Sequence, residues 1–102
     1  MVEIDFNSLK IELGEELLPI GTVLLVQGIK QPVMVYGRKQ LQGDTEKVWD
    51  YVACPYPQGH LGEDTNVFFS HSQIQEVVFK GFESEGEKAI RKQLTSLFSG
   101  KE

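Results

Sequence analysis

Hydrophobic and polar residues alternate along several short segments in the middle of the chain. These segments are rich in Val, Ile, Tyr and Phe and are bounded by Gly, Pro, Asn or Asp, which is typical of β-strands. We predict five strands, at residues 22–27, 32–38, 48–53, 67–70 and 74–79. Gly37 falls inside the second of these and predicts a β-bulge there. Five short strands at regular spacing predict a small, strongly bent antiparallel sheet or a small SH3-like barrel.

The connections between these strands carry turn-forming residues. Gly43 and Asp44 predict a tight hairpin turn before the third strand. The segment CPYPQGHLG, residues 54–62, contains two prolines and two glycines and predicts an irregular loop. Residues 4–18 mix hydrophobic spacings of two and four, so they fit either a short strand followed by a helical turn or one frayed helix.

The C-terminal part of the chain has a helical pattern, which predicts a helix over about residues 84–98. Ser84 followed by Glu87 fits a capping box, in which each side chain accepts a backbone N–H of the other residue. Acidic residues come first and basic residues follow, as the helix dipole favours. The apolar residues have the spacing i, i+4, i+7 and i+8, and they are Ile90, Leu94, Leu97 and Phe98. This stripe either packs on the sheet or meets a partner helix, and packing is favoured because an exposed stripe is costly in a monomer.

Composition is that of one ordinary globular domain. The chain has 102 residues, of which 40% are hydrophobic and 25% are charged, and a chain of this length has room for one core. We therefore expect a single α+β domain over residues 1–102, with the sheet over about 20–80 and the helix after it.

Charge and hydropathy exclude several function classes. The net charge of -5 repels phosphate backbones and anionic lipid, so we expect no nucleic-acid partner. No apolar run approaches the roughly 20 residues of a membrane helix, so we expect no membrane insertion. The first residues, MVEIDFNSLK, lack the pattern of a secretory signal, and the lone cysteine fits a reducing compartment. A cytoplasmic location is the expectation.

One stretch, residues 50–71, concentrates the residues with catalytic potential, which are Cys54, His60, Asp64 and His71. A hydrolase using Cys54 with a histidine base is one interpretation. However, Cys54 follows a strand and precedes a proline, whereas activated thiols lie at helix N-termini or in basic clusters. The Cys-x5-His and His-x10-His spacings also match no zinc loop. A buried structural cysteine is therefore favoured, and we predict no catalytic residues, no metal and no cofactor.

Aromatic residues are the better candidates for function. Most of them should fill the core, but a strand that exposes one face could present Trp49 or Tyr51 as an interface anchor. The candidate partner contacts are Tyr36, Arg38, Trp49, Tyr51, Leu94 and Phe98.

Five short motifs occur in order between residues 17 and 83. They read Leu-Pro-Ile-Gly, Gly-Arg, Asp-Tyr-Val, Tyr-Pro-x-Gly-x-x-Gly and Phe-Phe-x-His, at residues 18–21, 37–38, 50–52, 56–62 and 68–71. In this combination the chain resembles a family of Gram-positive bacteria, domain-of-unknown-function family 4176 (DUF4176). The motifs end before the predicted helix.

The resemblance implies a role beside type VII secretion loci, where such small proteins are encoded with LXG-domain toxins. There they look like chaperones or targeting factors that bind the helical N-terminal domain of the toxin in the cytosol, with a second small helical protein as a further partner. No enzymatic activity is implied. An immunity protein that binds the catalytic end of the toxin is the main alternative, and the Cys54 hydrolase is a weaker one.

Overall fold

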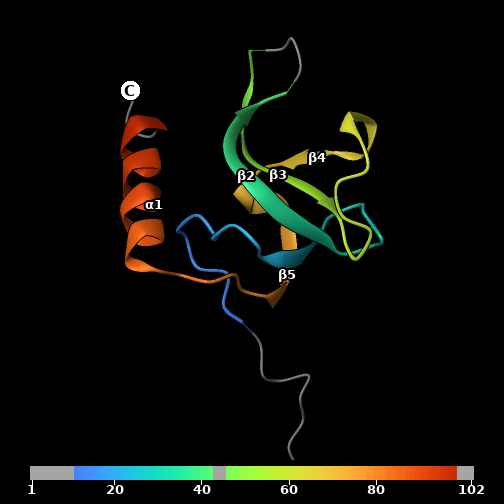
Figure 1. Ribbon diagram of the computed structural model, residues 1–102, viewed down its shortest axis with the longest axis horizontal. Helices are drawn as coiled ribbons and strands as arrows, with labels where there is room; N and C mark the ends of the chain where they lie inside the picture. The colour runs from blue at the N-terminus through green and yellow to red at the C-terminus, as the bar shows by residue number, and fades with distance from the viewer. Residues whose placement is uncertain (1–10, 43–45, 99–102) are drawn as a thin grey trace, which may run out of the picture.

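The described part of the chain folds into one five-stranded sheet with a single α-helix beside it (Figure 1). The computed structural model describes residues 11–42 and 46–98. The strands are β1 (Val23–Val26), β2 (Val33–Leu41), β3 (Val48–Pro55), β4 (Val67–Phe69) and β5 (Ile74–Phe79). The helix is α1 (Glu85–Phe98), and two short 3-10 turns, η2 (Glu63–Thr65) and η3 (His71–Gln73), flank β4. The predicted α+β fold is confirmed.

The strand order is β4-β3-β2-β1-β5, and every neighbouring pair is antiparallel. The sheet is open, with β4 and β5 at its edges, as in the antiparallel sheet that the sequence predicted. Among the described residues, no helix is long and apolar enough to cross a membrane.

Only residues 11–18 of the segment predicted before β1 are described, and these form no helix. Residues 4–10 of the predicted element, like the Gly43-Asp44 turn, lie outside the described residues. Residues 11–18 are irregular apart from a single antiparallel bridge between Ile11 and Val77. This segment passes between α1 and the sheet (Figure 1) and buries Leu17 and Leu18 against the core.

The predicted bulge in β2 is confirmed, and it changes which side chains face inward. The register of β2 against β3 shifts between Val35 and Gly37. A Cβ on Gly37 would lie 2.7 Å from Cγ1 of Val52, so glycine is required at this close approach. Simple alternation places Arg38 on the same face as Tyr36. The extra residue instead turns Arg38 into the interior, where it is 7% exposed, while Tyr36 stays at the surface.

The core lies on one face of the sheet and is closed by residues 17 and 18. Tyr51 and Phe69 are its largest members, and their rings stack with centroids 5.2 Å apart. Its aliphatic part consists of Leu17, Leu18, Leu24, Val26, Val33, Val35, Ala53, Ile74 and Val77.

Candidate binding surface

Helix α1 contributes little to this core. None of its residues is buried, and only Leu94 packs against the core as a partly buried side chain. The other members of the predicted stripe stay in solvent: Ile90 is 48% exposed, Leu97 70% and Phe98 44%. The expectation that the whole stripe packs on the sheet is therefore wrong for three of its four residues.

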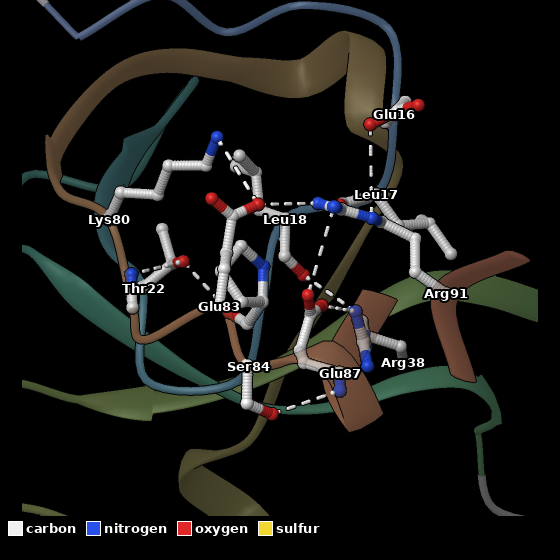
Figure 2. A network of polar contacts seen from close by, with 12 residues as sticks. Glu16, Leu17, Leu18, Thr22, Arg38, Lys80, Glu83, Ser84, Glu87 and Arg91 are labelled. Atoms are coloured by element: carbon white, nitrogen blue, oxygen red, sulfur yellow. Dashed lines mark hydrogen bonds and ion pairs between the residues drawn. The ribbon is translucent and has the colours of Figure 1, made fainter. Parts of the chain in front are cut away.

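A buried ion pair holds α1 to the sheet instead. The Arg38 guanidinium donates from Nη1 to Oε2 of Glu87 at 2.7 Å and to the carbonyl oxygen of Leu18 at 3.2 Å (Figure 2). The Arg38 and Glu87 side chains are only 5% and 10% exposed. Such a pair, one partner from β2 and one from α1, fixes the position of the helix through polar contacts.

A second arginine extends this network along α1. Arg91 donates from Nη1 to Oε2 of Glu83 at 2.7 Å and to the carbonyl oxygen of Leu17 at 3.2 Å. Its Nη2 also lies 3.8 Å from Oε1 of Glu87, which has no hydrogen bond of its own among the described residues. The hydrogen bond from Arg91 lowers the pKa of the Glu83 carboxyl. We call Arg38, Glu83, Glu87 and Arg91 the ion-pair network (Figure 2).

The network explains why only half of the predicted capping box forms. The N–H of Glu87 donates to Oγ of Ser84 at 3.1 Å, as a helix cap should. The carboxylate of Glu87, however, accepts from Arg38 rather than from the backbone of Ser84. The local sequence signal placed the helix start correctly but did not reveal the interior partner of Glu87.

One side of α1 is left exposed and uncharged. At 3.6 residues per turn, the side chains from Ser96 round to Ile90 form one continuous side of the helix that includes no charged residue. We call this side the uncharged flank, and it consists of Gly86, Ala89, Ile90, Gln93, Ser96 and Leu97, all exposed. Further exposed apolar side chains precede the helix, with Phe79 59% and Phe82 82% exposed. Exposed apolar surface of this kind marks interaction sites in soluble proteins.

Two of the predicted contacts are not at the surface. Tyr51 is fully buried, and Arg38 is held in the ion-pair network. The Tyr51 hydroxyl accepts the N–H of Leu18 at 3.0 Å and donates to Nδ1 of His71 at 2.6 Å. Alternation showed which residues share a face with Tyr51, but it did not show that this face is the interior. The structure therefore removes both residues from the candidate contacts.

The other predicted contacts are accessible to different degrees. Tyr36 is 37% exposed and Phe98 44%, with the Lys39 ammonium 5.8 Å from the Phe98 ring. Trp49 is half-buried, and its indole N–H donates to the side chain of Gln42 at 3.0 Å. Leu94 is partly buried and packs against the core. The sequence interpretation did not select Ile90 and Leu97 as contacts, although the stripe that contains them was visible.

Among the described residues, no hydrogen bond joins Cys54 to His60 or His71. Cys54 is buried inside β3, 2% exposed. The ring of His60 meets the ring of Tyr36 edge to face, with centroids 5.5 Å apart. Within residues 11–42 and 46–98, no three His, Cys, Asp or Glu side chains are grouped to hold a metal ion.

His71 has a structural position. Its Nδ1 accepts from Tyr51, so Nε2 carries the proton and donates to the carbonyl oxygen of Gly14 at 3.0 Å. Its backbone N–H donates to Asp50 at 2.8 Å, and the Lys39 ammonium lies 2.6 Å from the same carboxylate. Burial raises the pKa of Asp50, but these two hydrogen bonds outweigh burial and hold the pKa below its usual value. The contacts join η3 to β3 and to the segment before β1.

A protein-family model matches residues 17–90 of the sequence, the part that contains the five motifs. The chain belongs to the DUF4176 family. Its description is a domain of unknown function. The DUF4176 match includes Glu83 and Glu87, so it extends beyond the motifs, which ended near residue 83, into the first turns of α1. It ends before Leu97.

Neither curated proteins nor solved structures add to this assignment. No curated protein matches this DUF4176 chain, and no solved structure matches it either.

Proposed function

We propose that this DUF4176 protein is a non-catalytic binding protein that covers the helical N-terminal domain of an LXG toxin exported by type VII secretion. It acts in the cytosol as an accessory chaperone or targeting factor. Two findings support the proposal. The chain belongs to the family whose motifs implied this role, and the observation that carries it is the exposed, uncharged flank of α1.

The flank has the shape and chemistry for a partner helix. Gly86, Ile90, Gln93 and Leu97 follow one another at spacings of four, three and four, the repeat with which two helices pack side by side. Gly86 and the neighbouring Ala89 are small, so a second helix could approach closely. Ile90 and Leu97 supply the apolar contact, and burying each is worth about 1.5–3 kcal/mol.

The charged side of α1 would form the rim of this interface. Lys88 and Lys92 are exposed on the other side of the helix, and polar rims of this kind surround the apolar centre of most interfaces. An apolar helix surface that would aggregate in water is thereby kept covered until export.

The test is co-expression of this protein with the toxin encoded beside it, supplied as two separate halves. We expect the helical N-terminal half to be retained on the tagged protein and the catalytic C-terminal half to be lost. The double variant Ile90→Gln/Leu97→Gln should weaken retention at least tenfold, because it removes the apolar contact but adds no charge. The matched control Ile29→Gln/Val78→Gln makes the same change at two exposed apolar residues outside α1 and should bind as wild type does.

Two outcomes would contradict the proposal. Retention of the catalytic half alone would make the protein an immunity protein. Equal loss of binding in both double variants would show that the flank is not the contact surface.

A further inference from the structure

A hollow of about 500 Å³ opens on the face of the sheet opposite α1. The bulge at Gly37 places Arg38 and Tyr36 on opposite faces of the sheet, because it turns Arg38 toward α1 and leaves Tyr36 on the outer side. Val52 and Phe68 line the hollow with apolar surface, and Val52 is buried. The hollow does not contact the uncharged flank, so the function proposed above does not account for it.

An aromatic ring with a fixed orientation forms one wall. The Tyr36 hydroxyl donates to Oδ1 of Asn66, and His60 packs against the ring edge to face. Two contacts from the loop between β3 and β4 therefore hold the ring, which is 37% exposed. An aromatic face held in this way attracts a cation without losing further side-chain freedom.

Two carboxylates stand at the rim of the same hollow. Glu63 and Asp64 come from η2 and are exposed, and their carboxylates make no hydrogen bond or ion pair with any described residue. None of the described residues that line the hollow is Lys or Arg. Burial raises the pKa of Tyr36, and Cys54 and Glu63 raise it further. The hollow thus combines negative charge, an aromatic wall and an apolar floor.

We infer that the hollow binds an arginine side chain of the protein partner. A guanidinium stacks flat on an aromatic ring and pairs with carboxylates at its edge, while its aliphatic stem lies on apolar surface. The hollow offers these three contacts together, through Tyr36, the pair Glu63 and Asp64, and Val52 with Phe68. This inference deepens the proposed function, on which it rests for the nature of the partner.

The first arm of the test needs no partner protein. The probe is N-acetyl-arginine amide, titrated into the full-length chain and followed by amide chemical shifts. Its neutral isostere, N-acetyl-citrulline amide, is the control ligand. We expect saturable shifts at Tyr36, Glu63, Asp64 and Phe68 with the arginine probe and at least tenfold weaker binding of citrulline. The variant Glu63→Gln/Asp64→Asn should weaken arginine binding at least tenfold while the rest of its spectrum stays unchanged.

The second arm measures binding of the helical half of the toxin. Glu63→Gln/Asp64→Asn should weaken it at least tenfold at low salt, whereas Glu12→Gln/Glu76→Gln, which removes two exposed charges elsewhere, should not. Unchanged binding of the helical half, or equal shifts with citrulline, would overturn the inference. If the wild-type chain does not bind the helical half at all, the proposed function fails, and the arginine probe still decides whether the hollow binds a guanidinium.

Discussion

Replacing Glu87 with alanine should destabilise the protein by about 3–5 kcal/mol, because it leaves the Arg38 guanidinium buried without its counter-charge. Arg38 is only 5% exposed on its side chain and would retain a single acceptor, the carbonyl oxygen of Leu18 at 3.2 Å. Removing one partner of a buried pair costs this much, whereas exposed pairs contribute about 0–1 kcal/mol. A domain of this size has a total stability of about 5–15 kcal/mol, so the loss is large.

The assay is urea unfolding followed by Trp49 fluorescence and by circular dichroism at 222 nm. With a slope of about 1–3 kcal/mol per molar urea, the midpoint should fall by about 2 M. Glu85→Ala is the matched control, because Glu85 lies in the same first turn of α1 but is exposed. It should change stability by about 0.5 kcal/mol or less.

A double replacement separates loss of the pair from loss of packing. Arg38→Met/Glu87→Leu replaces both charges with apolar groups, so it should recover at least half of the stability lost in Glu87→Ala. Recovery is incomplete because the Leu18 carbonyl loses its donor. If Glu87→Ala unfolds at the wild-type midpoint, or if the double variant is less stable than the single one, the reasoning about the buried pair is refuted.

Three further predictions concern the same fold. Gly81→Ala should destabilise the fold by more than about 2 kcal/mol in urea unfolding, because the new Cβ would overlap the carbonyl oxygen of Ile20. Gly86→Ala, at an exposed position of α1, should instead stabilise the fold by about 0.5–1 kcal/mol, and equal effects of the two changes would refute this. Tyr51→Phe should cost about 1–3 kcal/mol, since the buried N–H of Leu18 and the half-buried ring of His71 lose their hydrogen-bond partner; an unchanged thermal unfolding temperature would refute this. Asp50→Asn should cost about 1–2 kcal/mol at pH 7. The folded-state pKa of Asp50 is depressed, so this stabilisation is present above about pH 4 and is lost as the pH falls through the lower folded value. The difference in stability between wild type and variant should therefore disappear in acid. A difference that stays constant with pH would contradict the reasoning.

Local sequence was sufficient to find the elements. β5 begins and ends at the residues that alternation predicted, and α1 begins directly after Ser84, its predicted cap. Gly37 was also read correctly as a bulge. The strand and the helix start depend on neighbouring residues only, since a two-residue period or a cap is visible within a few positions of the sequence.

The candidate site was harder to predict from the sequence, because the bulge in β2 changes which side chains face the interior. The inserted residue in β2 moves the next side chain to the other face, so Arg38 lies in the interior rather than at the predicted surface. The ion pair of Arg38 and Glu87 joins residues 49 positions apart in the sequence. No local sequence pattern predicts a contact between residues so far apart. Because Arg38 and Arg91 hold α1 through polar contacts, most of its apolar stripe lies outside the core.

The sequence by itself determined that this chain is a small acidic α+β domain of five strands and one helix, and its ordered motifs pointed to the DUF4176 family. Only the tertiary structure decided the strand order and the inward position of Arg38. It also decided that Ile90 and Leu97 are exposed and that Tyr36 and Glu63 line the same hollow. The physical reason is that secondary structure follows from the dihedral preferences and periodicity of adjacent residues. Surfaces and buried ion pairs depend instead on which distant segments pack together, and that is settled by the free energy of the whole fold.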